Sequence, residues 1–294
     1  MSGSFDQCQL PDGRHLDIRV SGPAGGLPLV FHNGTPTAAT PYRAIERAAH
    51  ERGLRLVTTS RPGYGDSTRQ PGRSVVDVVA DTTTVLAAIG AERCLVAGWS
   101  GGGPHALACA ARLEAAAAAL VIASFAPYGA EGLESMAGLD EDDETEDEAA
   151  LPGEDRLRSD LLAARDEMKE VAVANIVSLL EPLDDVDKAV LTDDVEFAED
   201  LASGLREGLR TGVDGWLDDD LAFDKPWGFD VKEISVPTMI WHGSADLKVP
   251  FAEGEWLASH VPGASAHLEQ GEGHLSIGLS ALDRMLDELV SAGR

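Results

Sequence analysis

The spacing of the hydrophobic positions changes early in the chain. In "FDQCQLPDGRHLDIRVSG", two short runs of near-alternating polarity flank Pro11-Asp12-Gly13, a pattern that predicts an antiparallel hairpin. Continuous apolar runs follow, each ending in Gly, Pro, Ser or Asp, as is typical of strands buried on both faces. They are "LPLVFHNGTP", "LRLVTTSRPGYGDS", "RCLVAGWSGG", "AALVIASFAP" and "VPTMIWHGSAD".

Helix-like segments of crossover length separate these runs. They are "YRAIERAAHERG", "SVVDVVADTTTVLAAIG" and "GPHALACAARLEAAA". Because strand and helix alternate, the pattern predicts an α/β protein with a doubly wound, mostly parallel sheet. The alternation stops after Pro127 and resumes at about Ile234, so we expect a core domain of residues 1–127 and 234–294 with a helical insertion at 128–233.

The charge balance limits the possible partners. Acidic residues outnumber basic ones 51 to 23, and the formal net charge is −28, which disfavours nucleic acid and anionic membranes and leaves a small-molecule substrate. Part of the excess is "DEDDETEDE", Asp140 to Glu148, which we expect to be a solvated loop and not a binding site. The pattern does not indicate an oligomeric state.

Targeting and cysteine patterns add little chemistry. With no basic-plus-apolar leader and no run of roughly 18 apolar residues, we expect a cytoplasmic protein without a membrane span. Cys8, Cys94 and Cys109 are odd in number and lack metal-ligand spacing. We therefore expect buried free thiols, no metal site and no cofactor.

A serine marks the candidate chemistry. Gly98-Trp99-Ser100-Gly101-Gly102 fits G-x-S-x-G, with an apolar strand before it and an alanine-rich helix after it. Small neighbours let a sharp strand-to-helix turn close, so that the serine hydroxyl projects at a helix N-terminus. A structural Gly-Ser turn is the alternative.

Serine becomes a nucleophile when an imidazole, itself oriented by a carboxylate, accepts its proton. Asp246 follows an apolar strand in "TMIWHGSADLKVP", and His274 lies in a glycine-flanked loop, giving the order Ser, acid, His. An ordinary turn aspartate and a structural histidine are the alternatives. Gly101 and Thr35 are the predicted backbone donors to an oxyanion, although "HNGTP" also fits a plain Gly-Pro turn.

These features together resemble the α/β-hydrolase fold superfamily over essentially the whole chain. The resemblance rests on "NGTP", "RPGYGDS", "GWSGG", "HGSAD" and "GEGH" in that order. It implies that Ser100 is the nucleophile, Asp246 the acid, His274 the base and Thr35 and Gly101 the oxyanion donors, with a cap inserted after the sixth strand. The histidine usual before the oxyanion-loop glycine is replaced by Asn33, so the register of that loop is open by one residue.

The predicted function is a cofactor-free serine hydrolase that cleaves a small ester, thioester, lactone or amide through an acyl-enzyme. A serine nucleophile argues against the dehalogenase and epoxide hydrolase branches. A proline iminopeptidase-like aminopeptidase, a carbon–carbon bond hydrolase or peroxide-using relative, and a non-catalytic ligand-binding member of the fold remain alternatives.

Specificity is expected to lie in the insertion. Four aromatic residues are candidates for an apolar substrate pocket, although core packing would account for each: Trp99, Tyr128, Trp216 and Trp227. Asp218, Asp219 and Asp220 would suit a substrate amine, but we expect them to be solvated at a helix start.

Overall fold

A computed structural model describes residues 5–133 and 153–294. Its centre is an eight-stranded sheet of order β1-β2-β4-β3-β5-β6-β7-β8. The first two strands pair antiparallel, as the N-terminal pattern predicts, and β3 to β8 are parallel. The strands are β1 Asp6–Gln9, β2 His15–Ser21, β3 Pro28–His32, β4 Arg55–Thr59, β5 Cys94–Trp99, β6 Ala116–Ile122, β7 Thr238–Gly243 and β8 Ser265–Glu269.

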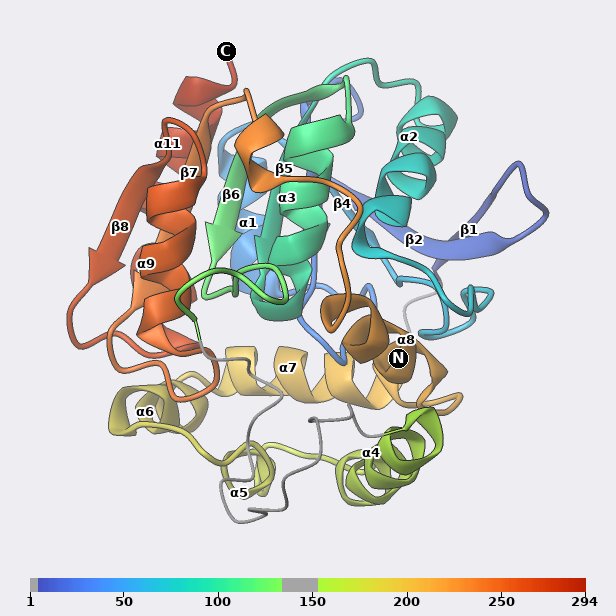
Figure 1. The fold of residues 1–294 in the computed structure, drawn as a ribbon, viewed down its shortest axis with the longest axis vertical. Helices are drawn as coiled ribbons and strands as arrows, with labels where there is room; N and C mark the ends of the chain where they lie inside the picture. Colours follow the sequence, from blue (N-terminus) through green and yellow to red (C-terminus); the bar gives the residue numbers. More distant parts are fainter. Residues whose placement is uncertain (1–4, 134–152) are drawn as a thin grey trace.

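Helices cover both faces of the sheet (Figure 1). Along β3, Leu29 and Phe31 face a core that includes α1 and α11, whereas Val30 faces a core that includes α2, α3 and α9. Burial on both faces explains why these strands read as continuous apolar runs. The covering helices are α1 Arg43–Glu51, α2 Val78–Ala88, α3 Gly103–Arg112, α9 Phe251–His260 and α11 Leu282–Ala292, with the short α10 Ser276–Ser280 before the last.

A helical layer lies between β6 and β7 in the chain and covers the carboxyl ends of the parallel strands (Figure 1). It consists of α4 Glu154–Met168, α5 Ile176–Leu179, α6 Asp185–Asp193, α7 Val195–Gly208 and α8 Asp214–Phe223. This is the cap expected after the sixth strand. The boundaries at 127/128 and 233/234 stay a prediction, and Asp140 to Glu148 lie outside the described residues.

One helix–strand boundary was predicted wrongly. The segment "GPHALACAARLEAAA" reads as helix to Ala117, but α3 ends at Arg112 and Ala116 already belongs to β6. Alanine favours helix intrinsically, and pairing with β5 outweighs that preference.

The three cysteines are free and buried, as expected. Burial raises the pKa of Cys94 and of Cys109 to about 12, so both thiols stay protonated and unreactive at neutral pH. Among the described helices, none is long and apolar enough to cross a membrane.

Candidate active site

Ser100 occupies the sharp turn between β5 and α3. Its φ is +54°, in the left-handed region, and a short 3-10 turn over Ser100–Gly102 leads into α3. The flanking glycines are required sterically, because a Cβ on Gly98 would clash with the Gly102 carbonyl and one on Gly102 with the His32 carbonyl. The turn therefore closes only with the spacing G-x-S-x-G.

His274 and Asp246 form a hydrogen-bonded pair at the same end of the sheet. Asp246 follows β7, and its Oδ2 accepts a 2.8 Å hydrogen bond from His274 Nδ1. Its Oδ1 accepts the backbone N–H groups of Lys248 and Val249, each at 2.8 Å. Burial alone would raise the pKa of the Asp246 carboxyl, but the charge and hydrogen bond of His274 and the Val249 amide hold it below its usual value. Asp246 is therefore an ionised acceptor that orients the imidazole.

The backbone of His274 is fixed on both sides. The Trp99 indole Nε1 donates to the His274 carbonyl at 3.0 Å. The His274 N–H donates to Oδ2 of Asp187, a residue of cap helix α6, at 2.8 Å. The ring, the carbonyl and the amide of His274 are thus each held by a different segment.

The two predicted oxyanion donors lie side by side. A Cβ built on Gly101 would be 3.1 Å from the Thr35 backbone nitrogen and would clash with the Thr35 hydroxyl. Gly34 lies close to Ser100, because a Cβ there would be 3.3 Å from the Ser100 Cβ. The loop after β3 therefore brings the Thr35 amide next to that of Gly101, beside Ser100.

The Thr35 side chain is anchored by a buried charge cluster. Thr35 Oγ1 donates to Asp219 Oδ2 at 2.7 Å, and Arg61 and Arg73 form ion pairs with Asp219 at 2.6 and 2.7 Å. Tyr64 donates its hydroxyl to the same carboxylate at 2.8 Å. Burial opposes ionisation of Asp219, but the two guanidinium groups outweigh it and hold its pKa far below the ordinary value.

The position of this cluster corrects one expectation. Asp218, Asp219 and Asp220 lie in the middle of α8; the first two are 2% and 0% exposed and Asp220 is partly buried, so none of them is solvated at a helix start. Asp218 forms a two-pronged hydrogen bond with Arg69, both distances being 2.8 Å. The carboxylates of Asp218 and Asp219 therefore hold arginines of the core domain against the cap and are not free to bind a substrate amine.

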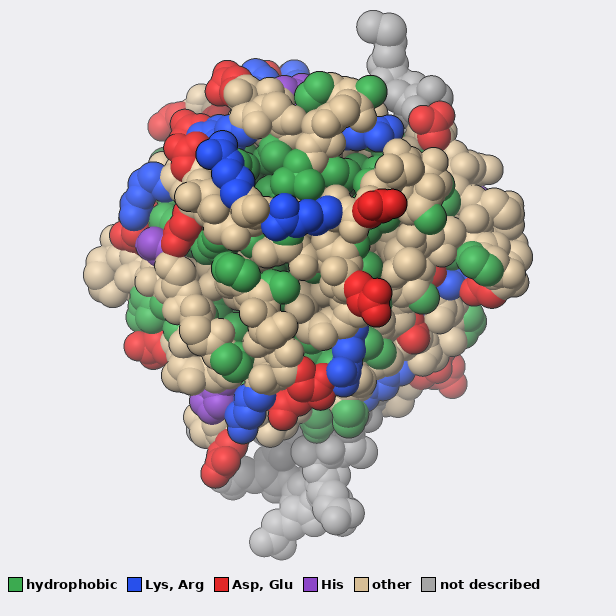
Figure 2. Space-filling model, turned by 90° about the horizontal axis from the view of Figure 1, so that it is seen from above, with side chains coloured by type: hydrophobic (Ala, Val, Ile, Leu, Met, Phe, Trp, Pro, Cys, Tyr) green, Lys and Arg blue, Asp and Glu red, His purple; other side chains and the backbone are tan. Residues whose placement is uncertain are grey.

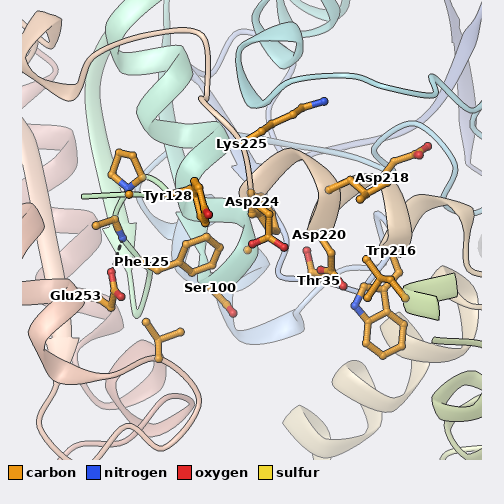
Figure 3. A pocket seen from close by; sticks show the side chains of 18 of the residues that line it. Thr35, Ser100, Phe125, Tyr128, Trp216, Asp218, Asp220, Asp224, Lys225 and Glu253 are labelled. Atoms are coloured by element: carbon orange, nitrogen blue, oxygen red, sulfur yellow. Dashed lines mark hydrogen bonds between the residues drawn. The ribbon is translucent and has the colours of Figure 1, made fainter. Parts of the chain in front are cut away.

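Ser100 lies where two cavities meet. The smaller, about 290 Å³, is lined by Ser100, His274 and mostly apolar cap residues, including Phe197, Leu201 and Leu205. The larger, about 1090 Å³, also reaches Ser100 and is richer in carboxylates (Figure 3). Thr35, Ser100, Trp216 and Lys248 line both cavities.

Charged groups in the larger cavity carry shifted pKa values. Burial, together with the neighbouring Asp219 and Asp224, raises the pKa of Asp220 well above normal. Burial also raises the pKa of Glu253, although its carboxylate accepts the Ala126 N–H at 2.8 Å (Figure 3). Burial lowers the pKa of the Lys248 ammonium, against the effect of nearby Glu181, Asp246 and Asp187. This cavity thus combines a mostly apolar wall with partly desolvated ionisable groups.

Three of the four predicted pocket residues line these cavities. Trp99 lines the smaller cavity, Tyr128 the larger and Trp216 both. Trp227 lines neither: it is 2% exposed and packs against Phe125 and Phe229, so the prediction for it is corrected. A tryptophan near the end of a cap segment is equally suited to core packing, and sequence spacing does not separate the two roles.

Several residues around the site leave no distinct signal in the sequence. Asp187 gave no signal, because one aspartate in an amphipathic helix is ordinary. Arg61 stands in "RPGYGDS", a pattern that assigns this arginine no role, and Lys248 lies two residues after Asp246. Residues 5–133 and 153–294 contain no group of three or more metal-ligating side chains, and the expectation of cofactor-free chemistry stays a prediction.

Comparison with known proteins agrees with this architecture. A non-heme chloroperoxidase from Streptomyces lividans is 24% identical, with 89% of each chain covered. Among solved structures, an enol-lactonase from Burkholderia xenovorans LB400 aligns with a TM-score of 0.69 at 16% identity, covering 97% of this chain and all of that one. A bromoperoxidase from Bacillus anthracis aligns with a TM-score of 0.70 at 19% identity, covering 98% and 100%. The family model described as alpha/beta hydrolase fold matches residues 28–280, and the chain therefore belongs to the α/β hydrolase fold family.

Proposed function

We propose that the protein is a serine hydrolase that cleaves a small ester, thioester, lactone or amide through an acyl-enzyme. The observation that carries the proposal is the His274–Asp246 pair, 2.8 Å apart, whose imidazole shares a cavity wall with Ser100 on its strained turn. Nucleophile, base and orienting carboxylate are the minimum set for acyl transfer by serine.

In the proposed reaction, Ser100 Oγ attacks the substrate carbonyl carbon while His274 Nε2 takes the hydroxyl proton. The tetrahedral oxyanion accepts hydrogen bonds from the backbone N–H groups of Gly101 and Thr35. When the intermediate collapses, the leaving group takes the proton from His274, and the acyl group stays on Ser100. A water that His274 deprotonates then attacks the ester, releasing the acid and restoring the serine.

The two cavities suggest where the acyl group and the leaving group of the substrate bind. The smaller one, with Trp99, Phe197 and Leu201 in its wall, suits a short apolar acyl group. The larger, carboxylate-rich one suits the leaving group. We therefore expect faster hydrolysis of short-chain aryl esters than of long-chain ones, since a chain longer than the smaller cavity would have to share the larger one with the leaving group.

Perhydrolysis is a second candidate. A chloroperoxidase, a haloperoxidase and a bromoperoxidase are among the proteins that this chain resembles. With the same proposed residues, hydrogen peroxide in place of water would attack the acyl-enzyme and release a peracid. The test supplies a short-chain ester together with hydrogen peroxide. The rate of peracid formation, divided by the rate of ester hydrolysis without peroxide, measures how much of the acyl-enzyme reacts with peroxide.

The test of the proposal is the Ser100→Ala variant. Its turnover of a short-chain aryl ester should fall by roughly 10⁴ to 10⁶, because the three residues act as a unit. A fluorophosphonate should label the wild-type protein on Ser100, located by peptide mass spectrometry, and leave the variant unlabelled. Near wild-type turnover in a Ser100→Ala variant with an unchanged circular dichroism spectrum would sink the proposal.

A further inference from the structure

We propose that Asp187, a residue of the cap, positions the base of the reaction by holding the backbone of the His274 loop. The cap would then be part of the catalytic machinery as well as a cover over the substrate. This inference rests on the proposed function, because it takes His274 to be the base.

Asp187 makes three contacts with one loop of the core. Its Oδ2 accepts the His274 N–H at 2.8 Å, and its Oδ1 accepts the N–H groups of Leu275 and Ser276 at 2.8 and 2.9 Å. The side chain comes from α6, some ninety residues earlier in the chain, and the residue is only 1% exposed. A single carboxylate thus ties three successive amides of the loop to the cap.

The loop is built to receive this carboxylate. A Cβ on Gly273 would lie 2.5 Å from Asp187 Oδ1 and 2.6 Å from Asp184 Oδ1, so any other residue directly before His274 would have to displace these carboxylates. The Gly273 N–H is satisfied separately by Ser276 Oγ at 2.8 Å. Asp187 therefore enters a space that the loop leaves open, and its three acceptor contacts go to amides that start α10.

The other contacts of His274 explain why the amide contact matters. Asp246 orients the ring through Nδ1, and Trp99 holds the carbonyl, but neither restrains the N–H side of the residue. With Asp187 removed, the peptide before His274 is free to rotate, and the imidazole moves with it. A displacement of about 1 Å between reacting groups costs on the order of 100-fold in rate.

The experiment compares Asp187→Asn with Asp194→Asn. Asp194 caps helix α7 in the same cap by accepting the Phe197 N–H at 2.9 Å, so its change is chemically matched and does not touch the His274 loop. In Asp187→Asn, the amide replaces one acceptor oxygen with a donor that faces backbone N–H groups. We expect kcat on a short-chain aryl ester to fall about 10- to 100-fold with KM within about twofold, and the rate of fluorophosphonate labelling to fall in parallel.

A spectroscopic readout distinguishes positioning from general destabilisation. In wild type, the proton between His274 Nδ1 and Asp246 should give a downfield proton resonance. In Asp187→Asn that resonance should shift or broaden through exchange with water, whereas in Asp194→Asn it should match wild type even if Tm is lower. An unchanged resonance and labelling rate in a folded Asp187→Asn variant would overturn the inference.

One further measurement, on the wild-type protein, completes the test. If Asp187→Asn does not fold, hydrogen exchange of the wild-type protein still tests the contacts of Asp187. The amides of His274, Leu275 and Ser276 should exchange as slowly as those of β5. Rapid exchange of these three amides would refute the contacts. Failure of the proposed function can be told apart from failure of this inference. If the proposed function is wrong, Ser100→Ala retains turnover, but Asp187→Asn still changes the resonance.

Discussion

Ser100 is one of two described non-glycine residues with a positive φ, the other being Ala123. A left-handed conformation costs a non-glycine residue about 1 to 3 kcal/mol and persists where the surroundings enforce it. Here the backbone is packed so tightly around Gly98 and Gly102 that neither position has room for a Cβ, and this packing holds Ser100 in the strained conformation. Glycine would adopt this conformation without strain, so the presence of serine supports a functional role for its side chain.

The acid of the proposed triad gives a prediction at the same scale. Asp246→Asn should lower kcat by about 10⁴ and leave KM nearly unchanged, because an asparagine no longer selects the His274 tautomer that accepts the Ser100 proton. Steady-state kinetics on a short-chain aryl ester measures the two constants separately. Retention of most of the activity would refute the proposed triad, since Phe125-Ala126-Pro127, at the alternative position for the acid after β6, offers no carboxylate.

At the scale of elements, helix α8 joins cap and core through charge. Asp219 is fully buried between Arg61 and Arg73, whose side chains are 2% and 3% exposed. Removing one partner of such a group leaves buried charges without compensation, which costs about 3 to 5 kcal/mol. The same carboxylate holds the Thr35 side chain, so stability and the position of this proposed oxyanion donor depend on one residue.

Asp219→Asn should therefore lower the free energy of unfolding by about 3 to 5 kcal/mol, measured in urea at pH 7, and should also reduce kcat. The wild-type contribution depends on pH with a definite sign. Because the pKa of Asp219 is lower in the folded state than the unfolded value of about 3.9, its stabilisation is complete well above pH 4 and is lost as the pH falls below that value. A variant as stable as wild type at pH 7 would contradict this account.

The parallel sheet was predictable because buried strands and turn residues leave local signals. The positions of Ser100, Asp246 and His274 were predictable for the same reason, because each lies a few residues after the carboxyl end of a strand. The α3–β6 boundary was not predictable, since the alanines from Ala115 onward suit a helix alone and become strand only through pairing. Asp187 and Asp219 were not predictable as anchors, because their partners lie 87 to 89 and 146 to 184 residues away.

For the whole molecule, the net charge of −28 is the dominant electrostatic feature. On the face in Figure 2, acidic and basic side chains are interspersed, which provides local compensation. The carboxylates in excess nevertheless repel one another. Salt screens this repulsion, with a Debye length of about 8 Å at physiological ionic strength. Exposed ion pairs weaken in salt as well, but each contributes only about 0 to 1 kcal/mol.

We therefore expect Tm to rise by several degrees between about 0.02 and 0.3 M sodium chloride at pH 7, where the carboxylates are ionised. Differential scanning calorimetry measures the change, and chloride is preferred because sulfate strengthens apolar burial independently. The effect should shrink near pH 4.5, close to the sequence pI of about 4.4. A falling Tm in salt would mean that attractive pairs outweigh the excess charge.

The position of Ser100 in the walls of both cavities bears on which acceptor receives the acyl group. After the first half of the proposed reaction, the departed alcohol or amine leaves the larger chamber vacant while the acyl group fills the smaller one. Whatever enters the vacated chamber next competes with water for the same ester. An alcohol that fits there would yield a new ester, so the product ratio is set by the occupancy of one chamber and not by the chemistry of the serine.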